Sequence, residues 1–208
     1  MKSLFIVFEG IDGSGTSTQA ALLKDYLLFK DYKAVLTCEP SSGPIGNLIR
    51  ESMKRRVNFV NDSKKFDEQM AYLFAADRHD HLYNDVDGVF KLMEKHINVI
   101  STRYYFSSLA YHCSNDDEFK FVKNLNCKFP KPDLVIYIDI SLETALARLG
   151  NRSSIDMYEN REKLLEVKEN YAKIFKDYSG AYLIIDGNDK INCVHDKIVS
   201  FIEESFDV

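Results

Sequence analysis

Short apolar runs and longer amphipathic stretches alternate along the chain. The apolar runs are typical of buried strands and lie at residues 4–8, 33–38, 97–100, 133–139 and 181–186. The stretches between them carry apolar residues at helical spacing and predict helices at residues 18–30, 44–56, 66–82, 86–95, 157–178 and 192–204. Alternating strands and helices predict an α/β fold, in which helices cover both faces of a parallel sheet.

The chain of 208 residues shows no internal repeat and no low-complexity segment, so we expect one domain over residues 1–208. In parallel sheets of this kind, ligands bind at the carboxyl ends of the strands. Residues that directly follow the apolar runs are therefore the first candidates for a functional site.

Composition and charge narrow the range of partners. The net charge of −5 argues against a nucleic-acid partner, because proteins that bind nucleic acids are more often basic. No apolar run approaches the about 18 residues of a membrane span, and the N-terminus does not resemble a signal peptide. None of the cysteines forms a C-x-x-C pair, which argues against a zinc site. We therefore expect a cytoplasmic protein with reduced thiols and no membrane partner.

A glycine-rich segment directly follows the first predicted strand. It nearly fits the phosphate-binding pattern G-x-x-x-x-G-K-[ST]. Glycines let the backbone curl so that several N–H groups face one anion, at the positive end of the next helix. These residues are candidates for binding the phosphates of ATP: Gly10, Ile11, Asp12, Gly13, Ser14, Gly15, Thr16, Ser17 and Thr18. Ser17 stands where a hydroxyl binds Mg²⁺, whereas Thr16 stands where the pattern has lysine.

The wider segment at residues 8–19, FEGIDGSGTSTQ, resembles the opening of thymidylate kinases. Further blocks resemble the same family in the same order: EPSSGP at 39–44, LFAADR at 73–78, RYYFSSLAY at 103–111 and KPDL at 131–134. The resemblance implies a P-loop NTPase three-layer sandwich with strand order 2-3-1-4-5. It also implies ATP and Mg²⁺ as cofactors, transfer of a phosphoryl group to dTMP to give dTDP, and a homodimer.

The resemblance assigns dTMP-binding roles to residues of these blocks. In the family, the position of Phe74 stacks on thymine and that of Arg78 bonds its O4, although spacing alone would also suit a core phenylalanine. Two arginines correspond to phosphate ligands, and a serine and a tyrosine contact the base and the deoxyribose. The substrate-binding set is Glu39, Arg50, Phe74, Arg78, Arg103, Ser108 and Tyr111.

Catalytic roles are implied for Asp12 and for arginines of a lid over about residues 148–161. The family carboxylate at Asp12 positions the acceptor phosphate, and lid arginines stabilise the transferred group, so Arg148 and Arg152 are the candidates. Gly13 beside Asp12 follows the bacterial type of the family. Residues 187–190 correspond to the loop that contacts adenine.

Four further positions depart from the family pattern: Thr16, Cys38, Thr102 and His112. Thr16 and Thr102 replace a lysine and an aspartate near the phosphates, and we expect these two side chains to lie close together as a compensated pair. Three functions stay open on these departures. The chain is a working thymidylate kinase, a kinase for another nucleotide as His112 suggests, or a nucleotide-binding protein that has lost catalysis.

Overall fold

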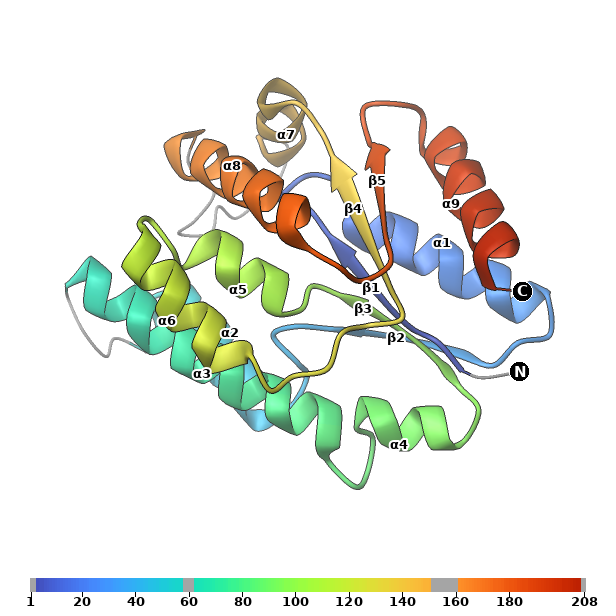
Figure 1. Cartoon of the computed structure of the whole chain (residues 1–208), viewed down its shortest axis with the longest axis horizontal. Helices are drawn as coiled ribbons and strands as arrows, with labels where there is room; N and C mark the ends of the chain where they lie inside the picture. Colours follow the sequence, from blue (N-terminus) through green and yellow to red (C-terminus); the bar gives the residue numbers. More distant parts are fainter. Residues whose placement is uncertain (1–2, 58–61, 151–160, 207–208) are drawn as a thin grey trace.

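The computed structural model describes residues 3–57, 62–150 and 161–206 and contains a five-stranded parallel sheet (Figure 1). The strand order is β2-β3-β1-β4-β5, as the family resemblance implied. The strands are β1 (Phe5–Glu9), β2 (Ala34–Cys38), β3 (Asn98–Thr102), β4 (Leu134–Asp139) and β5 (Tyr182–Asp186). All five predicted strands are confirmed, with small shifts of their ends.

Strand β1 forms the centre of the sheet, and each of its five residues is buried. It pairs with β3 on one side, where Phe8 lies opposite Thr102, and with β4 on the other, where Glu9 lies opposite Tyr137. This register brings the residues that follow β1 and β3 to the same edge of the sheet.

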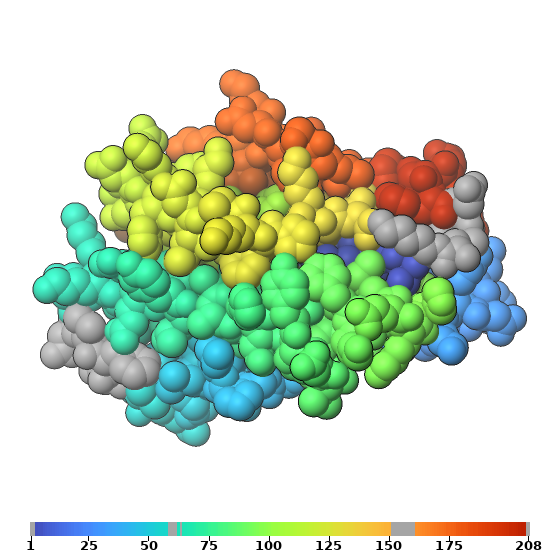
Figure 2. Space-filling model, turned by 60° about the horizontal axis from the view of Figure 1, so that its bottom comes forward, coloured from blue at the N-terminus to red at the C-terminus, as the bar shows by residue number. Residues whose placement is uncertain are grey.

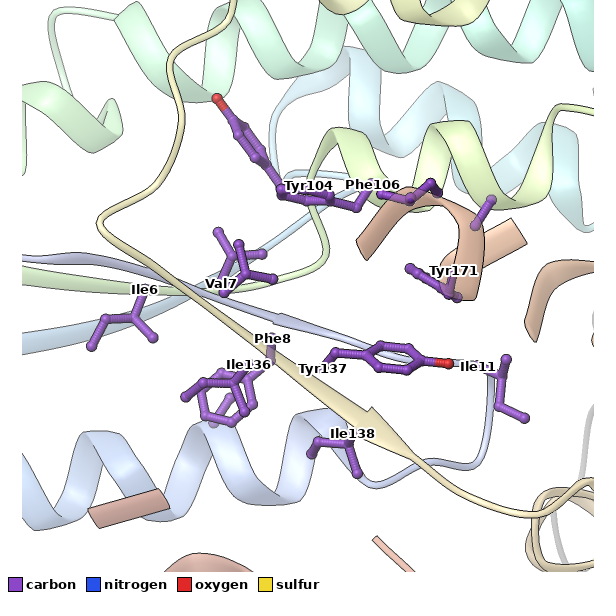
Figure 3. Close-up of a cluster of buried hydrophobic side chains, with 14 of the residues drawn as sticks. Ile6, Val7, Phe8, Ile11, Tyr104, Phe106, Ile136, Tyr137, Ile138 and Tyr171 are labelled. Carbon is purple, nitrogen blue, oxygen red and sulfur yellow. The ribbon is translucent and has the colours of Figure 1, made fainter. Parts of the chain in front are cut away.

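Helices cover both faces of the sheet. Helices α1 (Thr16–Phe29) and α9 (Ile191–Phe206) pack against each other on one face, and α5 (Tyr105–Tyr111) and α8 (Arg161–Asp177) pack together on the other (Figure 1). Figure 3 shows the alternation of β4 between these layers. Ile136 and Ile138 point toward α1, whereas Tyr137 points to the opposite side and lies 4.9 Å from the Tyr171 ring, measured between ring centroids.

Four further helices lie toward the side of the sheet that carries β2 and β3: α2 (Pro44–Met53), α3 (Ser63–Tyr83), α4 (Val89–Glu94) and α6 (Asp116–Asn126). Helix α7 (Leu142–Leu149) follows β4 and contacts α8 (Figure 1). Seen from below, the yellow-green surface of α6 lies against the blue-green surface of α3 (Figure 2). Along the described residues, no helix is long and apolar enough to cross a membrane.

The helix predictions hold with two omissions. The helix predicted at residues 157–178 is confirmed from Arg161 onward as α8, and residues 157–160 lie outside the described part of the chain. Helix α7 begins after Ser141, which caps it, because the Ser141 Oγ accepts from the Thr144 N–H at 3.1 Å. Helices α5 and α6 were not predicted, since α5 has only seven residues and α6 is rich in charged side chains.

Candidate active site

The glycine-rich segment forms the turn from β1 into α1. Gly13 and Gly15 have φ angles of 84° and 96°, a region that side chains other than glycine rarely adopt. A Cβ atom at Gly13 would also lie 3.0 Å from the Ala145 carbonyl oxygen. The N-cap of helix α1 is Gly15, which has no side chain, so no capping side chain occupies the N–H groups of the first turn. This geometry suits a phosphate at the turn.

A cavity of about 300 Å³ opens beside this turn. Every predicted substrate-binding residue lines it, together with the predicted catalytic aspartate: Asp12, Glu39, Arg50, Phe74, Arg78, Arg103, Ser108 and Tyr111. These residues come from the phosphate turn, the chain after β2, helices α2 and α3, and the segment after β3. The structure therefore gathers residues from across the first half of the chain around one cavity.

Three of these side chains form a polar cluster on the phosphate-turn side of the cavity. The Arg103 guanidinium forms an ion pair with Asp12 Oδ1, and the Tyr111 hydroxyl donates to Asp12 Oδ2 at 2.9 Å. The Asp12 N–H in turn donates to the Tyr111 oxygen at 3.2 Å. Burial raises the pKa of Tyr111, so its hydroxyl stays protonated and remains a donor to Asp12.

Arg103 holds an unusual backbone conformation. Its φ of 75° is in the left-handed region, although it is not a glycine, and its N–H donates to the Phe8 carbonyl at 2.8 Å. Non-glycine residues in this region are uncommon and concentrate at functional sites. The turn points the guanidinium toward Asp12, on the cavity side of the sheet edge.

Glu9 is a buried carboxyl group of the site that sequence reasoning missed. It accepts hydrogen bonds from the Tyr104 N–H at 2.7 Å, the Ser107 hydroxyl at 2.6 Å and the Tyr171 hydroxyl at 2.7 Å. Burial nevertheless raises the pKa of Glu9 to about 7. The signal was present in the sequence, since an acidic residue that ends a fully apolar strand is costly to bury without partners.

The base side of the cavity contains Phe74, Arg78 and His112. The Arg78 side chain is 1% exposed, and its Nε donates to Glu39 Oε2 at 2.9 Å. The rings of Phe74 and His112 lie 5.3 Å apart between centroids. Burial lowers the pKa of His112 to about 3, and the positive charges of Lys163 and Arg78 add to this effect, so the imidazole is neutral.

Arg50 is a half-buried residue of the cavity wall rather than a surface side chain. Its Nη1 donates to the Ser41 carbonyl at 2.6 Å and its Nη2 to the Pro40 carbonyl at 2.5 Å. These bonds fasten α2 to the chain that follows β2. Arg50 therefore lies on the same cavity as Arg103, as its predicted phosphate-binding role requires.

Arg148 lies at the end of α7 and contacts the phosphate turn from behind. Its Nη1 donates to the carbonyls of Gly13 at 3.1 Å and Ser14 at 3.3 Å, and its Nη2 donates to that of Gly187 at 3.0 Å. Arg148 thus joins the turn to the loop after β5, where adenine contacts were expected. Arg152 and most of the expected lid lie outside the described residues.

The predicted Mg²⁺ ligand, Ser17, lies at the start of helix α1. Ser17 and Thr102 line a second cavity, of about 990 Å³, on the β2 side of the phosphate turn. The described residues contain no group of three or more acidic, histidine or cysteine side chains that could hold a metal ion. The Ser17 hydroxyl is an oxygen donor of the kind that binds Mg²⁺ together with phosphates and water, so the residues present are compatible with the predicted ion.

Comparison with known proteins agrees with this site. A family model described as Thymidylate kinase matches residues 8–198. A probable thymidylate kinase of Methanococcus aeolicus is 40% identical over 94% of this chain and 93% of its own length. Similar coverage is found for a probable thymidylate kinase of Thermococcus kodakarensis, at 35% identity, and a putative thymidylate kinase of Treponema pallidum, at 36%.

Several of these relatives are archaeal, so the bacterial type that Gly13 suggested is not supported. The match extends over nearly the whole chain and includes the phosphate turn and the residues of the cavity. The chain belongs to the thymidylate kinase family.

Proposed function

We propose that the protein transfers the γ-phosphoryl group of ATP to dTMP and releases dTDP and ADP. The observation that carries this proposal is the position of Asp12, which belongs to the phosphate turn and also lines the cavity with Phe74, Arg78 and Arg103. A nucleotide on the turn and a nucleotide in the cavity would therefore meet at this carboxylate.

The cavity residues hold the acceptor in this proposal. Phe74 offers an aromatic face to the pyrimidine, and Arg78 offers a fixed N–H donor to a base carbonyl. Arg103 and Arg50 bind the dTMP phosphate, while Asp12 orients it. Tyr111 packs against the sugar and disfavours a 2′-hydroxyl by lack of space. The phosphate needs no general base, because a phosphate monoester is already nucleophilic.

The donor side lacks the usual lysine. The backbone N–H groups from Gly13 to Thr18 bind the ATP phosphates, and bound Mg²⁺ neutralises part of their charge with Ser17 as its protein ligand. Arg148 or Arg152 supplies the positive charge that Thr16 cannot. The proposed lid over about residues 148–161 would close over this side.

A coupled assay of ADP release with dTMP, dUMP and UMP tests the activity. We expect ATP-dependent turnover that is fastest with dTMP, and we expect Thr16→Lys to change kcat by less than about tenfold, because another cation already acts. Absence of dTMP phosphorylation by the purified wild type would contradict the proposal.

Two alternative functions are each favoured by specific residues. Thr16 and Thr102 favour a nucleotide-binding protein without catalysis, for which dTMP would raise the melting temperature while no product forms. His112 favours a kinase for another nucleotide, which the substrate panel would reveal. We also propose a homodimer in the cytoplasm; sedimentation of the purified protein tests the dimer.

A further inference from the structure

We infer that His81, which does not line the substrate cavity, is a positioning residue for Arg78 and thereby sets the discrimination of the base. The inference rests on the proposed function and names a residue that acts on the same site from outside.

The Arg78 guanidinium makes three hydrogen bonds and one ion pair with the protein. Nε donates to Glu39 Oε2 at 2.9 Å, and Nη2 forms an ion pair with the same oxygen at 2.6 Å. Nη2 also donates to Ser108 Oγ at 3.2 Å, and Nη1 donates to Asn126 Oδ1 at 2.5 Å. One Nη1 hydrogen is left without an acceptor among the residues that the structure describes. A single donor on a wall of the cavity selects a carbonyl acceptor on the base, because an amino group there would leave it unpaired.

The direction of that donor depends on Glu39. Its side chain is 1% exposed and binds both Nε and Nη2 of Arg78 through the same oxygen, so rotation of the carboxylate would turn the guanidinium with it. The other carboxylate oxygen, Oε1, lies 3.2 Å from His81 Nδ1. A carboxylate only accepts, so Nδ1 carries the proton and donates.

Thr37 fixes the far side of the imidazole. Its hydroxyl lies 2.6 Å from His81 Nε2, and both residues line the second cavity. The contacts form one chain from Thr37 through His81 and Glu39 to Arg78, across the end of β2. His81 therefore connects the wall of the second cavity to the base side of the substrate cavity.

Helix α3 presents these groups on one face. Phe74, Arg78 and His81 stand at positions i, i+4 and i+7, so they project in similar directions. Asp77 on the same helix binds both the Ser41 N–H, at 2.7 Å, and the Ser41 hydroxyl, at 2.6 Å. The chain around Glu39 is thus held in place by Asp77, and the remaining freedom of the Glu39 carboxylate is restricted by His81.

The test compares His81→Phe, which removes both ring nitrogens, with His81→Asn, whose amide can replace the Nδ1 donor. His79→Asn on the exposed side of the same helix is the matched control. We expect His81→Phe to raise KM for dTMP about tenfold, with KM for ATP and kcat changed less than about threefold. The ratio of kcat/KM for dTMP over dCMP should fall by about the same factor. His81→Asn should recover most of both losses, and His79→Asn should match the wild type.

The inference would be overturned if the ratio of kcat/KM for dTMP over dCMP were the same in His81→Phe as in the wild type. Equal losses with both nucleotides give this result, because general destabilisation affects dTMP and dCMP alike. Thr37→Val, which leaves the imidazole in place, provides a second measurement if His81→Phe does not fold. We expect a smaller rise in KM for dTMP and a smaller fall of the same ratio, and no change in either would also overturn the inference. Failure of the proposed function itself is distinguishable, because the wild type would then not phosphorylate dTMP, whether or not it binds dTMP in calorimetry.

Discussion

Glu9 has a high pKa for a carboxyl group, because it lies at the end of a fully buried strand of the sheet. Its pKa is about 7 in the folded protein and about 4.5 when exposed. The folded state therefore binds the proton more tightly than the unfolded chain does. The protonated Glu9 carboxyl therefore stabilises the folded state fully below pH 4.5, and this contribution is lost as the pH rises to about 7.

Glu9→Gln should remove this dependence on pH. The interval between 4.5 and 7, at about 1.4 kcal/mol per pH unit, corresponds to about 3 kcal/mol. We expect the free energy of unfolding of the variant, relative to the wild type, to rise by about that amount over this range. Urea unfolding at several pH values measures it. Glu94→Gln on an exposed helix end is the control, and parallel curves for the wild type and Glu9→Gln would contradict the prediction.

Tyr111→Phe tests the polar cluster around Asp12. The variant removes the hydroxyl that donates to Asp12 Oδ2 and accepts from the Asp12 N–H. We expect kcat/KM for dTMP to fall about tenfold, because both the carboxylate and the N–H of Asp12 lose a hydrogen-bond partner. Steady-state kinetics measure the loss. Tyr26→Phe, whose hydroxyl binds Glu203 far from the cavity, should behave as the wild type, and an unchanged Tyr111→Phe enzyme would argue against the cluster.

Among the elements, the strands were predictable from sequence and the helix contacts were only partly so. Apolar runs identify β1 to β5 because strands buried on both faces need continuous hydrophobic character. The prediction of Phe74 and Arg78 as site residues came from a family block, because helical spacing alone would also suit a core phenylalanine. Asp77 and His81 share that helix face but were missed, since their partners Ser41 and Glu39 are 36 and 42 residues away in the chain. Periodicity identifies a face and does not identify what it contacts.

The phosphate turn is an element whose shape depends on Arg148. Arg148→Ala removes the bonds to the carbonyls of Gly13, Ser14 and Gly187, so the turn loses its link to the loop after β5. We expect KM for ATP to rise about tenfold or more, with a smaller change in KM for dTMP. Steady-state kinetics with each substrate varied in turn measure this difference. Arg56→Ala, at an exposed residue that follows α2, is the control, and equal effects on both KM values would contradict the prediction.

At the scale of the whole molecule, the position of the site followed from topology. A parallel sheet with this strand order gathers its strand ends at one edge, and the register of β1 with β3 places Asp12 beside Arg103. The burial of Glu9 depends on hydrogen bonds from Ser107 of α5 and Tyr171 of α8, which the local sequence does not encode.

Binding of dTMP should stabilise the whole fold. At a dTMP concentration about a hundred times its Kd, the added stability is about 2.7 kcal/mol, which raises the Tm by several degrees. Thermal unfolding followed by circular dichroism measures the shift. Arg103→Ala should abolish most of it, because it removes the cation beside Asp12. A shift of equal size in this variant would show that dTMP binds elsewhere.

The junction between β1 and its glycine turn has a mechanical consequence. Asp12 follows the central strand by three residues, belongs to the phosphate turn and lines the cavity. A displacement of β1 would therefore move the phosphate turn and the Asp12 carboxylate together. In the proposed reaction, the group that orients the acceptor phosphate thus follows the donor side, whereas Phe74 and Arg78 belong to α3 and are not tied to β1 in this way.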